Sequence, residues 1–138
     1  MSSHLLFQTD ESDWNEDGRR TLRDFVHLVA STHLKVKILN LFVADPYLCL
    51  SSEYVALRLG ADIASVQRSA RELSDANTFS YCASFAQSDL CCLSFASYLP
   101  AIQHCLRLWR LSLSMAPGFV CEQLDTADYS VQTLREAA

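Results

Sequence analysis

The sequence predicts a mainly α-helical fold with a small β-hairpin. Residues 49–79 have the pattern of two short helices joined by a tight turn, and strand-forming residues follow at once. Further amphipathic helical patterns lie before and after this stretch. A helix-turn-helix followed by a hairpin, or wing, is a winged helix-turn-helix. We therefore expect a winged helix-turn-helix with additional N- and C-terminal helices.

Capping residues predict where the two central helices begin and end. Ser51 and Ser52 can accept hydrogen bonds from the free amides at the start of the first helix. Gly60 follows the last apolar residue of that helix, where a left-handed residue commonly ends a helix. Asp62 can then cap the second helix, and its negative charge suits the positive helix start.

The second helix, about residues 62–75, has one apolar face and one polar face. The apolar residues recur at spacings of three and four, and they are Ile63, Val66, Ala70 and Leu73. A short helix that exposes Arg and Gln suits the major groove of DNA. We expect Gln67 and Arg68 to read base edges there. Arg71 and Lys35 would hold phosphates, and Ser65 completes the DNA-facing set. The alternative is that both arginines are ordinary solvated charges.

Two helices are predicted before the helix-turn-helix. Residues 1–18 form an acidic tail that we expect to be flexible. Thr21 can cap a helix that runs to about residue 30, and a further helix spans about residues 34–44. The helix over residues 34–44 ends before Asp45, because a residue that precedes a proline avoids the helical region.

The wing is predicted as strands at residues 79–85 and 90–95. It contains no Lys or Arg, so it cannot supply basic contacts to phosphates. Cys82 lies on one strand and the pair Cys91 and Cys92 on the other, so a thiol switch or soft-metal site is one hypothesis. The alternative is that these cysteines are small core residues, because no basic neighbour lowers a thiol pKa.

A long helix is predicted from about Pro100 to Met115, since Pro suits the first turn of a helix. Apolar residues cover two of its faces, whereas a monomer has one core against which to bury a helix. We therefore expect residues 99–138 to form a dimerisation region. The expected dimer residues are Ile102, Leu106, Leu108, Trp109, Leu111 and Leu113. The alternative is a helix buried on all sides within one larger core.

Composition indicates one soluble domain, because the chain has 138 residues of which 50% are hydrophobic. No apolar run reaches the length of a membrane span, and the N-terminus lacks the pattern of a signal peptide. We therefore expect a cytoplasmic protein without membrane contact. The net charge is −5, and much of the acidic excess precedes the first basic residue, Arg19. A monomer should bind DNA weakly, whereas a dimer doubles the basic contacts.

Residues from about 28 to 95 resemble the winged helix-turn-helix domain of small bacterial and archaeal repressors, the ArsR-like group first and MarR-like regulators next. LVASTHLKVKILNLF is similar to the first core helix of this family, SSEYVALRLGADIASVQRSAREL to its helix-turn-helix and SDANTFSYC to the turn into its wing. In such repressors, terminal helices commonly build the dimer. ArsR-like metal sensors carry two cysteines one residue apart before the turn, whereas this chain has only Cys49 there. Metal sensing is therefore not implied at that site.

Two functional hypotheses follow. The first is a dimeric regulator that binds double-stranded DNA, with a winged-helix domain at residues 19–98 and the major-groove helix at about 62–75. The second is a winged-helix module that binds a protein partner, which the acidic balance, the uncharged wing and the apolar terminal helix favour. An enzyme is not expected, because no glycine-rich phosphate loop or nucleophile motif occurs. Neither a metal nor another cofactor is expected, since no C-x-x-C pair occurs and the four histidines are scattered.

Overall fold

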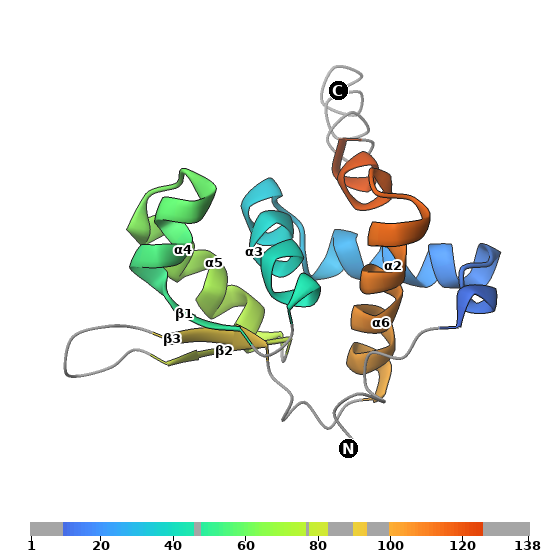
Figure 1. Ribbon diagram of the computed structural model, residues 1–138, viewed down its shortest axis with the longest axis horizontal. Helices are drawn as coiled ribbons and strands as arrows, with labels where there is room; N and C mark the ends of the chain where they lie inside the picture. Colours follow the sequence, from blue (N-terminus) through green and yellow to red (C-terminus); the bar gives the residue numbers. More distant parts are fainter. Residues whose placement is uncertain (1–9, 46–47, 77, 83–89, 94–99, 126–138) are drawn as a thin grey trace, which may run out of the picture. The chain divides into compact units, whose positions relative to one another are not determined.

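The computed structural model describes residues 10–45, 48–76, 78–82, 90–93 and 100–125. Its elements follow in the order η1 (Glu11–Asp13), α2 (Glu16–Leu28), α3 (His33–Ala44), β1 (Cys49–Ser51), α4 (Ser52–Leu59), α5 (Ile63–Asp75), β2 (Phe79–Cys82), β3 (Leu90–Leu93) and α6 (Pro100–Met115) (Figure 1). Residues 119–125 are also helical. This order of helices with one small sheet confirms the predicted fold class, a winged helix-turn-helix with additional terminal helices.

The chain divides into two compact units. The terminal unit comprises Met1–His33 and His104–Ala138, and the winged-helix unit comprises Leu34–Gln103. Helix α2 therefore groups with the C-terminal residues, whereas the sequence pattern groups it with the helix-turn-helix. One contact that joins the two ends of the terminal unit is an edge-to-face pair between Phe25 and Trp109, whose ring centroids lie 6.1 Å apart.

The turn between α4 and α5 forms as its capping residues predict. The Ser51 side chain accepts a hydrogen bond from the Tyr54 amide at 3.2 Å and so caps α4. Gly60 ends α4 in the left-handed region, with φ 65° and ψ 36°. Asp62 caps α5 and accepts a hydrogen bond from the Ser65 amide at 3.0 Å. These three caps confirm the helix-turn-helix predicted from the sequence.

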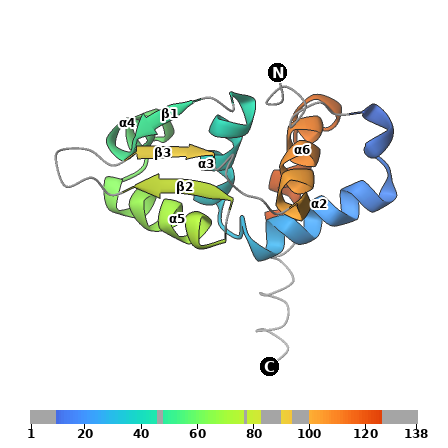
Figure 2. The ribbon, with the colours of Figure 1, turned by 90° about the horizontal axis from the view of Figure 1, so that it is seen from below.

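The sheet of the winged-helix unit has three antiparallel strands in the order β1-β3-β2. The hairpin of β2 and β3 was expected, whereas β1 was not, because its pairing partner lies far along the chain. Helix α5 packs against β2, and α4 contacts both β1 and α5. Figures 1 and 2 show α4 and α5 on one side of the sheet. The ends of the predicted strands at residues 83–85 and 94–95 lie outside the described residues.

Helix α5 buries most of its predicted apolar stripe. Val66, Ala70 and Leu73 are fully buried, and Ser69 between them is buried as well. Ile63 is different, because its side chain is 43% exposed at the first position of the helix. The stripe prediction is therefore wrong for Ile63 and confirmed for the other three residues, which fix the opposite face of α5 toward solvent.

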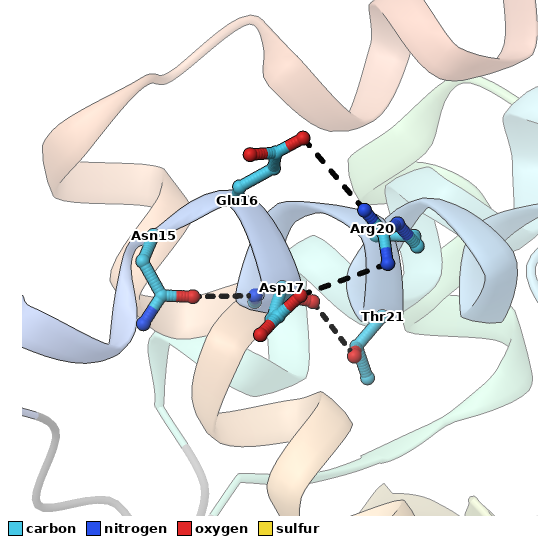
Figure 3. Close-up of polar contacts among 6 residues, drawn as sticks. Asn15, Glu16, Asp17, Arg20 and Thr21 are labelled. Carbon is cyan, nitrogen blue, oxygen red and sulfur yellow. Dashed lines mark hydrogen bonds and ion pairs between the residues drawn. The ribbon is translucent and has the colours of Figure 1, made fainter.

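Helix α2 begins at Glu16, earlier than the sequence predicts. Asn15 caps it by accepting a hydrogen bond from the Gly18 amide at 2.9 Å (Figure 3). Thr21 lies inside the helix, and its hydroxyl donates to the Asp17 carbonyl oxygen at 2.8 Å. Thr21 is therefore not the cap. Residues 10–18 of the expected flexible tail form η1, the start of α2 and the capping residues beside them, and residues 1–9 lie outside the described part.

Helix α6 has the predicted bounds, Pro100–Met115, and residues from both of its apolar faces are buried in the single chain. Four of the six expected dimer residues are at most 5% exposed, and these are Leu106, Leu108, Trp109 and Leu111. Ile102 and Leu113 are only half-buried. The sequence argument from two apolar faces is therefore wrong for these four residues, because the chain supplies enough core to cover them itself. Within the described ranges, no helix is long and apolar enough to cross a membrane.

Candidate nucleic-acid interface

Hydrogen bonds link Asp62, Ser65 and Arg68 at the N-terminal end of α5, next to its exposed face. Ser65 donates its hydroxyl to one Asp62 oxygen at 2.7 Å and its amide to the other oxygen at 3.0 Å. Arg68 then donates from Nη2 to the Ser65 hydroxyl oxygen at 3.4 Å. The side-chain and backbone hydrogen bonds from Ser65, and more weakly the charge of Arg68, lower the pKa of Asp62. The Asp62 carboxylate therefore caps α5 in its ionised form.

The contact with Ser65 directs the Arg68 side chain along the first two turns of α5. Arg71 lies three residues further and is also exposed, so the two arginines occupy neighbouring positions on the same side of the helix. Gln67 is partly buried. Of the sequence-predicted residues of α5, the structure brings Ser65 and Arg68 into contact and exposes Arg71. Among the described residues, no salt bridge involves Arg71.

Lys35 does not belong to this surface. Its residue is buried, its side chain is 10% exposed, and its Nζ lies 3.5 Å from Oε1 of Glu72. An ammonium group so placed cannot reach a phosphate without losing its carboxylate partner. The prediction that Lys35 holds a phosphate is therefore wrong. The sequence does not reveal this pair, because the glutamate lies on another helix far along the chain.

The cysteines of the wing lie on paired strands, as the sequence predicts, with Cys82 on β2 and both Cys91 and Cys92 on β3. Cys91 is 1% exposed, which fits the alternative of a small core residue. The register partner of Cys82 is Leu90, so Cys82 is directly opposite neither member of the pair. Cys92 is instead opposite Cys49 on β1. Sequence reasoning missed this pair because it did not predict β1.

A pocket in the winged-helix unit was also missed. This pocket of about 540 Å³ is lined by Lys37, Asn40, Leu41, Ala44, Asp45, Leu48, Arg58 and Leu59. These residues come from α3, α4 and the segment between them, so no local motif announces the pocket. It adds two cations, Lys37 and Arg58, to the surface of the unit. The described residues hold no group of three His, Cys, Asp or Glu side chains suited to a metal ion.

No protein-family model matches the sequence, and no curated protein matches it. Among solved structures, the YusO protein from Bacillus subtilis is similar, with a TM-score of 0.48 and 15% identity over 99% of this chain and 92% of that one. A mutant MarR from E. coli complexed with operator DNA is similar with a TM-score of 0.44 and 14% identity, over 96% of this chain and 90% of that one. Both TM-scores lie below 0.5, so we base the function on the geometry of this chain's own residues.

Proposed function

We propose that the protein is a cytoplasmic transcriptional regulator of the ArsR-like or MarR-like style that binds double-stranded DNA through α5. The observation that carries this proposal is the pair of exposed arginines, Arg68 and Arg71, on the second helix of a helix-turn-helix. The opposite face of this helix is fixed, because Val66, Ala70 and Leu73 are fully buried. A rigid helix that presents guanidinium groups is suited to the major groove.

The two arginines are proposed to have different roles. Arg68 lies near the N-terminal end of α5, the part of a recognition helix that contacts base edges. Its planar guanidinium group can bind guanine in a bidentate manner. Gln67 and Ser65 are its proposed neighbours in the groove. Arg71, one turn further along the helix, is proposed to hold a phosphate. Glu72 repels DNA phosphates less than an unpaired glutamate would, because its Oε1 lies 3.5 Å from Nζ of Lys35.

The regulator is proposed to act as a homodimer. One winged-helix unit offers few cations, and phosphate neutralisation supplies most non-specific affinity for DNA, so two units are needed for useful binding. Of the α6 residues, we retain only Ile102 and Leu113 as proposed dimer contacts, because they are half-buried in the single chain. The four buried residues Leu106, Leu108, Trp109 and Leu111 are not part of the proposed dimer interface.

A pair of variants tests the DNA-binding face. In Arg68→Ala/Arg71→Ala, we expect the affinity for a DNA duplex that the wild type binds to fall at least about tenfold, since a good base contact alone contributes about 1–3 kcal/mol. Fluorescence anisotropy measures the affinity, and far-UV circular dichroism checks the fold. Arg23→Ala is the matched control, because it removes an exposed arginine from α2 in the terminal unit. Unchanged affinity in a folded double variant would reject α5 as the DNA-binding face.

A protein-binding module is the second candidate, and one observation favours it. Three large apolar side chains are exposed on α4 and at the start of α5, namely Tyr54 (44%), Leu57 (79%) and Ile63 (43%). Exposed apolar groups of this size are typical of protein interfaces when they lie together. Leu57→Ser separates the two candidates: it should weaken a protein interface while leaving DNA affinity within about twofold of wild type.

A further inference from the structure

The three-stranded sheet places two cysteines opposite each other on different strands. Cys49 of β1 and Cys92 of β3 are register partners in an antiparallel pair. We propose that these two residues form a reversible disulfide when the protein meets a low-molecular-weight disulfide such as oxidised glutathione. The site is then a covalent redox modification site that joins β1 to β3.

The backbone geometry of this pairing suits a disulfide. Directly opposite residues in antiparallel strands have Cα atoms about 4.5–5.5 Å apart. Disulfides form across Cα separations of about 4.4–6.8 Å, so the backbone need not move. The pairing is also continuous, because Leu50 is opposite Cys91 and Ser51 is opposite Leu90 in the same register. Cys49 and Cys92 therefore hold opposite register positions within a regular ladder rather than at a single isolated bridge.

Exposure makes Cys49 accessible to an oxidant. Its residue is exposed and its thiol is free. Two other cysteines are excluded by burial. Cys91 is 1% exposed and has Leu50 and Tyr81 as its register partners. Cys105 lies in the terminal unit, where burial raises the pKa of its thiol to about 11, so little reactive thiolate forms there.

The reaction balances as two thiol–disulfide exchanges. The Cys49 thiolate attacks one sulfur of oxidised glutathione, which gives a mixed disulfide and releases one glutathione thiolate. The Cys92 thiolate then attacks the Cys49 sulfur and releases the second glutathione. Two electrons pass from the protein to glutathione, the S–S bond of glutathione breaks, and the protein S–S bond forms. The two thiol protons go to solvent and the released thiolates.

The position of this bond ties it to the helix-turn-helix. Strand β1 ends at Ser51, whose side chain caps α4. The loop closed by a bond between residues 49 and 92 contains the whole of α4 and α5. Such a bond limits the unfolded states of that loop and so stabilises the motif. This structural effect does not depend on the proposed DNA binding.

The full chain is incubated with reduced and oxidised glutathione at a series of ratios, quenched by alkylation, and mapped by proteolysis and mass spectrometry. We expect an intramolecular Cys49–Cys92 peptide pair in the fraction that runs as a single chain under denaturing, non-reducing conditions, with a loss of two hydrogens from the protein. It should be retained in Cys121→Ser, the matched control that removes another exposed cysteine. It should be absent from both Cys49→Ser and Cys92→Ser. A stable mixed disulfide on Cys49 would overturn the proposal, as would a bond from Cys49 to another cysteine or a bond between chains.

A thermal measurement provides a second readout that does not need a particular peptide to be detected. The oxidised wild type should unfold at a temperature about 5 °C or more above that of the reduced protein. Cys49→Ser should show no such shift between the two conditions, while Cys121→Ser should show the full shift. Equal melting temperatures for oxidised and reduced wild type would contradict a bond that closes the helix-turn-helix loop. Because no DNA is present, failure here is distinct from failure of the proposed function.

Discussion

Nζ of Lys35 lies 3.5 Å from Oε1 of Glu72, and this ion pair joins α3 to the helix that carries Arg68 and Arg71. The lysine side chain is 10% exposed and the glutamate side chain 52% exposed. The pair therefore connects the core of the winged-helix unit with the edge of the candidate DNA-binding face. Lys35 is therefore not available to a DNA phosphate, and its ammonium group partly offsets the negative charge of the half-exposed Glu72 carboxylate.

Breaking this pair should lower stability. In Glu72→Gln, the ammonium group of Lys35 remains mostly buried without its carboxylate, and we expect the free energy of unfolding to fall by about 1 kcal/mol. Urea denaturation measures this change. Lys35→Met and the double variant complete a mutant cycle, in which the double variant should lose less than the sum of the two single changes. Additive losses would show that the two side chains do not interact in solution.

Because Asp62 caps α5, the free energy of unfolding should depend on pH in the acidic range. Hydrogen bonds from Ser65 lower the pKa of Asp62 below its ordinary value of 3.8. Because the folded-state pKa is the lower one, ionised Asp62 stabilises the native state fully above the ordinary value. That stabilisation is lost as the pH falls through the folded-state value.

Two substitutions of Asp62 separate the cap from its charge. Asp62→Asn keeps an oxygen that can accept from the Ser65 amide, so its stability should vary less than that of wild type between about pH 5 and pH 2. Asp62→Ala should be less stable than both proteins at neutral pH, because the cap is lost. Denaturation curves across this pH range measure both effects. Identical pH profiles for wild type and Asp62→Asn would be the contrary result.

Gly18 should not tolerate a side chain. A Cβ there would meet the Asp13 carbonyl oxygen and would lie 3.2 Å from Cδ2 of Leu108. Gly18→Ala should therefore cost about 1–3 kcal/mol of unfolding free energy, the range typical of overpacking. Gly118→Ala is the control, because its nearest contact is Oε1 of Glu122 at 3.6 Å, an ordinary separation. Equal stability of the two variants would show that α2 does not pack here as described.

Two leucines of α6 should behave differently. Leu111 is 4% exposed, so Leu111→Ala should lower the free energy of unfolding by about 2–5 kcal/mol, as a buried leucine does. Leu113 is half-buried and is a proposed dimer contact, so Leu113→Ser should mainly weaken self-association. Sedimentation velocity and urea denaturation of both variants separate these outcomes. If Leu111→Ala dissociated the protein without a loss of stability, the covered faces of α6 would be a subunit interface after all.

Features set by neighbouring residues were predictable from the sequence. The caps Ser51 and Asp62 accept hydrogen bonds from amides within one helical turn, and Gly60 supplies a left-handed backbone conformation at its own position. These roles could therefore be assigned from residue type and spacing. The bounds of α6 follow in the same way from its proline and its apolar pattern. The exposed position of Arg68 and Arg71 also follows, because the opposite stripe of α5 is apolar.

Features set by distant residues were not predictable. The short strand β1 exists through its pairing with β3, so Cys49 could not be matched with Cys92 from sequence alone. Lys35 has the character of a surface cation until Glu72 of another helix is known to lie beside it. Whether Leu108 and Leu111 face a partner or a core depends on how much of the chain folds over them. The start of α2 was missed because Asn15 caps it within a segment rich in acidic residues.

Salt-dependent binding of a mixed double-stranded DNA tests the central claim most directly. Fluorescence anisotropy gives the affinity at each salt concentration, and sedimentation gives the oligomeric state in parallel. We expect affinity to fall steeply with salt, and the slope of log affinity against log salt to shrink by about one unit per binding subunit in Arg71→Ala, because one phosphate contact is lost. A folded protein that binds no DNA even at low salt would contradict the regulator proposal and favour the protein-binding module.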